Sequence, residues 1–198
     1  MSEETPRRRG RPRTHDPEAA LRGVIPAFWT GGYDATSLDA LAEAAGMNRP
    51  SLYAALGDKR AMYLAALTRM REVVLRSAAE ALDSHDDLGA ALRAFYRSAI
   101  ETYMVGEGEA RRGCLVVCTA TTASYDDPEI AAAVREMVEG IEKLLAARFR
   151  RAGTDNPASR ARIAGSVVHS LAVRARARVP RRDLDRIVSD AVAQLAAA

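Results

Sequence analysis

Residues 36–59 decide the fold; they read Thr-Ser-Leu-Asp-Ala-Leu-Ala-Glu-Ala-Ala-Gly-Met-Asn-Arg-Pro-Ser-Leu-Tyr-Ala-Ala-Leu-Gly-Asp-Lys. The first half carries apolar residues at i, i+3, i+4 and i+7, which is one face of a short helix: Leu38, Leu41, Ala42 and Ala45. Thr36 or Ser37 is the expected N-cap. Gly46 supplies the left-handed backbone that ends a helix. The stretch therefore begins with one short amphipathic helix.

A second short helix is predicted after a turn of three or four residues. Asn48 is a good N-cap for it, and its inward residues are Leu52 and Ala55. Small Ala42 and apolar Leu52 suit two helices that cross closely. This is the spacing of a helix-turn-helix, but an αα-hairpin that merely packs has the same spacing.

The outward residues of the second helix, and the sequence on either side of it, favour DNA binding. Arg49, Pro50, Ser51 and Ala54 face outward from its N-terminal end, the end that a recognition helix places against base edges in the major groove. The stretch closely resembles the DNA-binding domain of the tetracycline-repressor (TetR/AcrR) family of transcription regulators. The resemblance covers residues 16 to about 67 and rests on Gly-Tyr-Asp-Ala-Thr-Ser-Leu (32–38), Leu-Ala-Glu-Ala-Ala-Gly-Met (41–47), Pro-Ser-Leu-Tyr (50–53) and Gly-Asp-Lys-Arg-Ala-Met (57–62).

Several residues of this stretch are expected to contact DNA. Arg49 is the only long donor at the start of the second helix, and its guanidinium suits the O6 and N7 edge of guanine. The resemblance implies a thymine-methyl contact for Pro50 and a phosphate contact for Lys59. We expect Tyr53 and either Thr36 or Ser37 to hold phosphates as well. The complete predicted set on the folded domain is Thr36, Ser37, Asn48, Arg49, Pro50, Ser51, Tyr53 and Lys59.

Residues 1–15 contain Pro, Arg and Gly without a periodic apolar residue, which predicts a disordered basic arm. Within it, Arg9-Gly10-Arg11-Pro12-Arg13 resembles the core of an AT-hook. Extended Gly and Pro between arginines let Arg9, Arg11 and Arg13 lie along a narrow minor groove, where the potential is most negative. The alternative is a solubilising tail. We expect a minor-groove arm because a helix-turn-helix follows.

Composition and periodicity predict an all-α protein. The chain has 198 residues, enough to bury a core, and only 5% are aromatic. Period 3.6 dominates, and no strand stands out. Its net charge is only +3, and the first fifteen residues alone carry that excess, so the globular part is not a general binder of polyanions.

The breaks along the chain divide it into about nine helices. The first runs from an Asp16 cap to Gly31–Gly32, with a kink expected at Pro26, and another is expected from Cys114 to about Ser124. We predict three parts: a disordered arm over 1–15, a three-helix helix-turn-helix domain over 16–61, and a helical effector-binding and dimerisation domain over 62–198.

The resemblance implies an effector pocket in the C-terminal part. Residues consistent with an apolar lining that carries a few hydroxyls are Phe95, Tyr103, Met104, Cys118, Thr121, Thr122 and Tyr125. Ordinary core packing explains most of them equally well.

The last two predicted helices, from Pro157 and from Pro180, each carry a long stripe of Ala, Val and Leu. Such stripes are too long to be covered by one short neighbour, and two pairs of these helices would make a four-helix bundle between two copies. The predicted interface is Ala164, Val167, Val168, Leu171, Ala175, Leu184, Ile187, Val188, Ala191 and Leu195.

Sequence signatures of enzymes are lacking: there is no Gly-rich phosphate loop, no H-E-x-x-H and no G-x-S-x-G. No metal site or cofactor is expected, since Cys114 and Cys118 with the scattered histidines do not give four placed ligands. The cysteine pattern indicates a reducing cytoplasmic location. The chain has no apolar run near the ~20 residues that span a bilayer.

We therefore predict a homodimeric, all-α transcription regulator, a repressor that leaves a palindromic double-stranded operator when a small molecule binds its C-terminal domain. One alternative is a ligand-independent DNA-binding or architectural protein. Another is a regulator that senses thiol redox through Cys118, although a buried Cys without a nearby cation behaves as a small apolar side chain. An enzyme is the third class.

Overall fold

The computed structural model describes residues 16–105, 113–120, 123 and 125–197, and the elements in this part of the chain are all helical, as predicted. The elements are α1 (Pro17–Ala35), α2 (Leu38–Ala44), α3 (Arg49–Leu56), α4 (Lys59–Asp83), α5 (Leu88–Tyr103), η1 (Val116–Ala120), α7 (Pro128–Arg151), α8 (Pro157–Arg176) and α9 (Arg181–Leu195).

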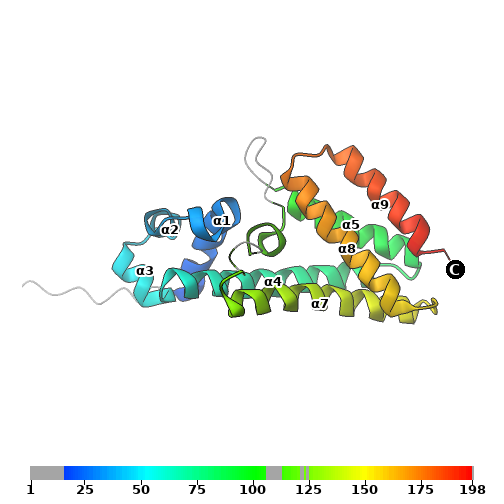
Figure 1. Cartoon of the computed structure of the whole chain (residues 1–198), viewed down its shortest axis with the longest axis horizontal. Helices are drawn as coiled ribbons and strands as arrows, with labels where there is room; N and C mark the ends of the chain where they lie inside the picture. Colours follow the sequence, from blue (N-terminus) through cyan, green and yellow to red (C-terminus); the bar gives the residue numbers. More distant parts are fainter. Residues whose placement is uncertain (1–15, 106–112, 121–122, 124, 198) are drawn as a thin grey trace, which may run out of the picture.

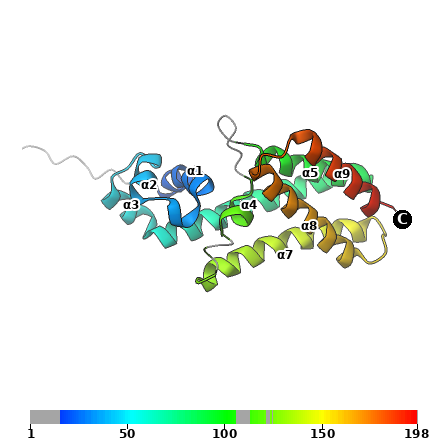
Figure 2. The ribbon, with the colours of Figure 1, turned by 45° about the horizontal axis from the view of Figure 1, so that its top comes forward.

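The helices form two groups joined by α4. Helices α1, α2 and α3 gather at one end, and α4 runs from them along the base of the second group (Figure 1). In that group α7 lies alongside α4, α8 crosses onto α7 and α5, and α9 packs on α5 and α8 (Figures 1 and 2). The short η1 lies between the groups and contacts both α1 and α8.

Most helices begin where a short polar side chain satisfies free N–H groups of the first turn. Such a side chain accepts a hydrogen bond from a backbone N–H two or three residues later. These N-caps are Asp16, Ser37, Asn48, Asp58, Asp87 and Asp127. The breaks between helices therefore follow from the local sequence.

Arg148 of α7 binds the C-terminal end of α4. Although it is charged, it is buried, with only 4% of its surface exposed. Its guanidinium donates to the carbonyl of Leu82 at 3.2 Å and to those of His85 and Asp86 at 3.2 and 2.6 Å. The carbonyls at the end of α4 and in the following turn thus receive a charged donor from a different helix.

The break within α1 lies at Gly32, at φ 75° and ψ −174°, where the first helix was predicted to end, while Pro26 keeps helical backbone angles. One local prediction needs correction. The helix expected from Cys114 to about Ser124 is a π-helix over Val116–Ala120, in which the Thr119 hydroxyl donates to the Leu115 carbonyl at 2.5 Å. A wider turn of this kind is uncommon, and apolar periodicity does not distinguish it from an α-helix.

The predicted dimer interface also needs correction, because most of its residues are buried inside one chain. The stripe on α8 packs on α5 and α7, and the stripe on α9 packs on α5 and α8. The residues concerned are Ala164, Val168, Leu171, Ala175, Leu184, Val188 and Leu195. Val167, Ile187 and Ala191 stay partly exposed. Ile163 and Val173, exposed by 55% and 54%, mark a different apolar face of α8.

Candidate DNA interface and ligand cavity

The α2–α3 turn has the geometry that a helix-turn-helix requires. Gly46 adopts φ 64°, and the N–H of Met47 donates to the carbonyl of Ala42 at 2.9 Å while that of Gly46 donates to Glu43 at 3.0 Å. This pair of bonds is a Schellman motif and closes α2 over its own last carbonyls. Asn48 Oδ1 then accepts from the N–H of Ser51 at 2.9 Å and opens α3. The predicted turn and both caps are confirmed.

Gly23 of α1 lets the first helix lie directly against this turn. A Cβ at position 23 would stand 2.7 Å from Cα of Ala45 and 2.8 Å from the carbonyl oxygen of Ala44. Both atoms belong to the backbone and cannot rotate away. Sequence reasoning missed this residue, although a glycine inside an otherwise helical segment is a recognised sign of close packing.

Arg49, the first residue of α3, is paired with Asp39 in the first turn of α2. Arg49 Nε donates to Asp39 Oδ1 at 2.6 Å, and Nη2 donates to Oδ2. This bidentate contact lowers the pKa of Asp39 below its ordinary value and raises that of Arg49. Both side chains are more than half exposed. Asp39 therefore fixes the direction of the guanidinium and must be outcompeted by any anion that binds there.

Helix α3 carries four of the eight residues of the folded domain that were predicted to contact DNA. Pro50 is exposed next to Arg49, and Tyr53 is 41% exposed one turn further on. Ser51 is only partly buried, whereas Leu52 is 1% exposed and points into the domain. Helix α3 thus presents the guanidinium of Arg49, the ring of Pro50 and the phenol of Tyr53 along one accessible face.

The two candidates for the cap of α2 lie in different environments. The Thr36 hydroxyl donates to the Gly32 carbonyl at 2.6 Å, and the residue is only 5% exposed. Ser37 is exposed, and its Oγ accepts from the N–H of Ala40 at 3.1 Å. Ser37 is therefore the N-cap and the one whose side chain reaches the surface.

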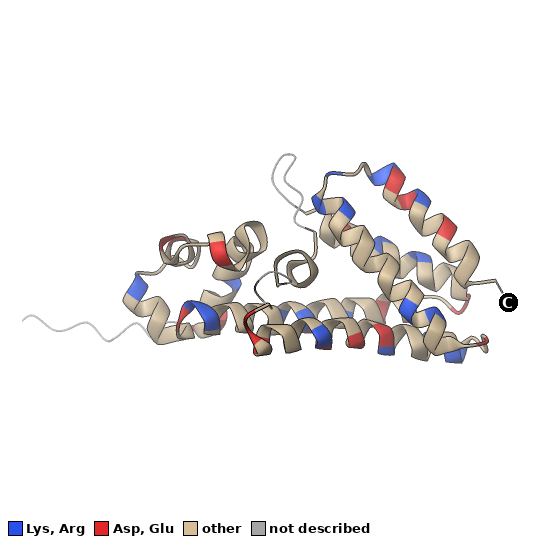
Figure 3. Cartoon of the chain, viewed as in Figure 1, with Lys and Arg blue, Asp and Glu red and all other residues tan. Residues whose placement is uncertain are grey.

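Lys59, the first residue of α4, is held close to the end of α1. Its Nζ donates to the carbonyl of Asp34 at 3.2 Å and lies 4.8 Å from the centroid of the Tyr33 ring. These contacts hold a cation beside the start of α4, and Figure 3 shows basic residues at the starts of both α3 and α4. The predicted arm residues Arg9, Arg11 and Arg13 lie outside the described residues.

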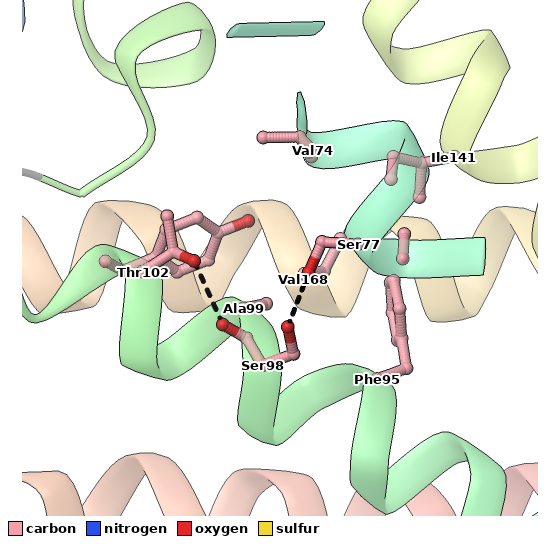
Figure 4. A pocket seen from close by; sticks show the side chains of 10 residues that line it. Val74, Ser77, Phe95, Ser98, Ala99, Thr102, Ile141 and Val168 are labelled. Atoms are coloured by element: carbon pink, nitrogen blue, oxygen red, sulfur yellow. Dashed lines mark hydrogen bonds between the residues drawn. The ribbon is translucent and has the colours of Figure 1, made fainter. Parts of the chain in front are cut away.

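A cavity lies inside the second group of helices, close to where the effector pocket was expected. It holds about 340 Å³ of empty space, its open mouth included. Phe95 and Tyr103, both predicted, line it from α5. Hydroxyls that the prediction missed also line it, and two of them meet: Ser77 Oγ of α4 and Ser98 Oγ of α5 are 2.9 Å apart (Figure 4).

The other predicted pocket residues lie elsewhere. Tyr125 is 89% exposed and lines neither this cavity nor a second, smaller one, which corrects that prediction. Met104 and Cys118 are partly buried without lining this cavity, whereas Cys114 borders the smaller one. Thr121 and Thr122 lie outside the described residues. Apolar and hydroxyl composition thus identified the region but not the face of each helix.

An ion pair links the start of α4 to the start of α7. Arg60 of α4 donates from Nε to Asp127 Oδ2 at 2.5 Å and from Nη2 to Oδ1 at 2.9 Å, with Glu129 at 3.2 Å. The contact with Arg60 lowers the pKa of Asp127 to about 2, and Asp127 is also the N-cap of α7. The first turn of α4 is thereby fastened to the first turn of α7.

A second link passes through α1. Trp29 Nε1 donates to the carbonyl of Gly113 at 2.9 Å, and Arg176 of α8 donates to the carbonyls of Trp29 and Thr30, both at 3.3 Å. Tyr63 of α4 shares a 2.8 Å hydrogen bond with Thr119 of η1. The helix-turn-helix group is therefore bonded to the segments that border the cavities.

The thiols do not have the environment of reactive cysteines. Burial raises the pKa of Cys114 to about 11. Burial also raises that of Cys118, which the charge of Arg176 opposes. Thiolates are the reactive species, so these surroundings disfavour oxidation at neutral pH. Within the described part of the chain, no three His, Cys, Asp or Glu side chains come together in a way that could hold a metal ion.

Comparisons with known proteins agree with this geometry. The family described as "Bacterial regulatory proteins, tetR family" matches residues 26–66, which include α2, the turn and α3. A cysteine mutant of the TetR family transcriptional regulator CifR, complexed with 26-bp double-strand operator DNA, has 30% sequence identity and a TM-score of 0.82 over 93% of this chain and 98% of its own. The chain belongs to the TetR family of transcriptional regulators.

Curated relatives of this TetR-family chain are regulators too. It is 32% identical over 124 residues to the HTH-type transcriptional repressor ComR of Escherichia coli (strain K12), covering 62% of this chain and 58% of ComR. It is 32% identical over 108 residues to the HTH-type transcriptional repressor BdcR of the same organism, covering 54% of each chain. The matches thus span little more than half the length of these relatives. Across 16–105, 113–120, 123 and 125–197, no helix has the length and apolarity needed to cross a bilayer.

Proposed function

We propose that the protein is a homodimeric transcriptional repressor that binds a palindromic operator and leaves it when a small molecule enters the cavity beside α4. The observation that carries DNA binding is the exposed N-terminal end of α3, where Arg49, Pro50 and Tyr53 share one accessible face. The operator DNA in the CifR complex supports this reading for a chain of the same fold.

Residues 16–61 would be the DNA-binding part in this proposal. Arg49 would leave Asp39 to read the O6 and N7 edge of guanine, and Pro50 would contact a thymine methyl. Tyr53 and Ser37 are exposed and Lys59 is partly exposed, and all three would hold phosphates, which position the domain without reading sequence. The arm of residues 1–15, with Arg9, Arg11 and Arg13, would enter the neighbouring minor groove.

Residues 62–198 would provide dimerisation and ligand binding. The outward face of α8 carries Ile163, Val167 and Val173, of which two are more than half exposed, and Ile187 and Ala191 of α9 stay partly exposed. Two copies that join these faces would form a four-helix bundle. Such a dimer would have to place its two α3 helices about 34 to 36 Å apart to fit successive major grooves.

Release would follow from the position of α4. This helix begins at the DNA-binding group, borders the cavity with Val74, Ser77 and Ala78, and is fastened to α7 by the Arg60–Asp127 pair. A ligand that prefers one placement of α4 shifts the spacing of the two recognition helices. By linkage, operator DNA must weaken ligand binding by the same factor by which the ligand weakens operator binding.

The test is selection of bound sequences from random DNA by the full-length protein, followed by binding assays with Arg49→Ala. We expect a palindromic consensus and a loss of discrimination at one base pair in each half-site, because that guanine contact is worth about 1 to 3 kcal/mol. Failure to enrich any sequence would refute the proposal. If Arg49→Ala weakened binding to every operator variant equally, Arg49 would position the domain on DNA without reading a base.

A further inference from the structure

Two cavities inside the second group of helices share one wall. The first lies between α4, α5, α7 and α8, and the second lies between α1, α4, α5, α7 and the segment 114–116. Val74, Thr102 and Tyr103 border both. A molecule that fills the first cavity therefore presses on side chains that also line the second.

The first cavity offers hydroxyls on an apolar background. Ser77 and Ser98 hydrogen-bond to each other across the α4–α5 interface, and the Thr102 hydroxyl donates to the Ser98 carbonyl at 3.1 Å (Figure 4). Around them lie Phe95, Ile141 and Val168. Since a serine hydroxyl has one donor and two acceptor sites, the Ser77–Ser98 pair, after its mutual bond, retains one donor and three acceptor sites for a further partner.

The surroundings of the cavities are unsuited to an ionised ligand. None of the described side chains that line either cavity is charged. Burial raises the pKa of Tyr103 well above its ordinary value, so the phenol stays neutral. An ion transferred here would lose its hydration without gaining a counter-charge from the walls, which is strongly unfavourable.

The second cavity places the DNA-binding group against the shared wall. Trp29 of α1 lines it together with Met70, Leu115 and Met137. The Trp29 indole also donates to the Gly113 carbonyl, next to Cys114 of the same lining. Trp29 is the only tryptophan in the sequence, so its emission reports on this wall alone.

We propose that the effector is an uncharged, mainly apolar molecule with one hydroxyl or carbonyl oxygen, which hydrogen-bonds to the Ser77–Ser98 pair and presses its apolar part on the wall shared with Trp29. This inference rests on the proposed function and specifies the chemical class of its ligand. Ser77 and Ser98 select for the oxygen, and the absence of a lining charge selects against ions. Because Val74, Thr102 and Tyr103 border both cavities, a ligand bound in the first cavity affects the packing of α1 at the second.

The test uses three probes of equal chain length on the full-length protein: 1-octanol, octanoate and octylammonium. At pH 7 only the first is uncharged. We expect 1-octanol to change the Trp29 emission with saturation and to raise the melting temperature. The two ions should do so at least tenfold more weakly. Equal or tighter binding of octanoate or octylammonium would overturn the proposal, and so would no saturable response to 1-octanol up to its solubility limit.

Two variants locate the binding group. Ser77→Ala and Ser98→Ala should each weaken 1-octanol binding about fivefold, the factor expected for one neutral hydrogen bond. Ser84→Ala at the exposed end of α4, which removes a hydroxyl that donates to the carbonyl of Ala81 at 2.7 Å, is the matched control and should leave the dissociation constant unchanged. If Ser77→Ala and Ser98→Ala behave like the control, the hydroxyl pair is not the recognition element.

Operator binding separates this inference from the proposed function. If 1-octanol binds as described but the selected operator stays bound, the ligand class stands and ligand-controlled release fails. If a charged probe displaces the operator through the same cavity, release stands and the ligand class is wrong.

Discussion

Asp39 holds Arg49 by two hydrogen bonds, so the residue expected to read a base starts out bound to a carboxylate of the neighbouring helix. The pair joins the first turn of α2 to the first residue of α3. It directs the guanidinium before DNA arrives, and it also opposes binding because phosphates repel the carboxylate.

Replacing Asp39 with Asn should therefore change affinity and specificity in opposite directions. We expect Asp39→Asn to strengthen binding to DNA of any sequence, because one negative charge is lost, and to reduce discrimination at the guanine position several-fold, because Arg49 loses its orientation. Fluorescence anisotropy with matched and mismatched operators measures both. Glu43→Gln, which removes the same charge from α2 without touching Arg49, should keep full discrimination; equal behaviour of the two variants would contradict the orienting role.

Lys59 should act through phosphate alone. Lys59→Ala is expected to lower affinity for all sequences alike and to reduce the slope of log affinity against log salt by about one unit. Lys143→Ala, an exposed cation on α7 far along the chain, is the control and should leave the slope unchanged. A Lys59→Ala protein with the wild-type slope would show that Lys59 only ties α4 to Asp34 and Tyr33.

Gly23→Ala should damage the helix-turn-helix without touching its surface. The added methyl group would meet the backbone at Ala44 and Ala45, and such overpacking costs about 1 to 3 kcal/mol of unfolding free energy. Gly165→Ala in α8 is the matched control, since its Cβ would meet only the flexible Glu142 side chain at 3.4 Å. Urea unfolding and operator binding should both report the loss at position 23; wild-type values in both would show that α1 moves aside freely.

The exposed face of α8 predicts where a charge prevents dimerisation. Ile163→Glu should give folded monomers in sedimentation velocity at micromolar concentration, because it buries a charge between copies. Val73→Glu on α4, at a residue 42% exposed, is the control and should stay dimeric. Leu171→Glu should unfold the chain instead, since Leu171 is fully buried within one copy. A dimeric Ile163→Glu protein would exclude this face.

The Arg60–Asp127 pair predicts a pH-dependent part of the stability. The contact lowers the Asp127 pKa from 3.8 to about 2, so the folded state binds its proton at lower pH than the unfolded state does. The stabilisation is complete above about pH 4 and is lost as pH falls towards about 2. The stability difference between wild type and Asp127→Asn should shrink over that range. Asp126→Asn at the exposed neighbouring position is the control; a difference that stayed constant would rule out the linkage.

The sequence predicted helices and their buried faces well wherever the signal lies within a single helix. Leu41 and Leu52 lie in the core as expected, and Asn48 caps α3. Period 3.6 identifies an apolar face, and a polar residue before it identifies the start of a helix. Both signals are local, so the α2–turn–α3 geometry could be derived without a structure.

What covers an apolar face could not be predicted, because that depends on how distant helices meet. Leu171 and Leu184 were assigned to a partner chain, but they pack inside this one. Ser77 and Ser98 could not be predicted as a pair, since the sequence does not show that a hydroxyl of one helix lies opposite a hydroxyl of another. Tyr125 resembled a pocket residue by composition alone, but it lies in the turn before α7 and is exposed.

The buried Arg148 has a consequence for how α4 can move. Its bonds to Leu82, His85 and Asp86 fix the far end of a helix whose 25 residues give a length of about 37 Å. A rod that turns about one end moves most at the other, and at the Lys59 end of α4 such a turn must stretch or break the Arg60–Asp127 pair that fastens it to α7. A tilt of about 5° over the length of such a helix would carry the Lys59 end sideways by roughly 3 Å. A slight change of angle at the cavity would thus be magnified, by leverage alone, into a shift comparable to the reach of a hydrogen bond at the start of the helix.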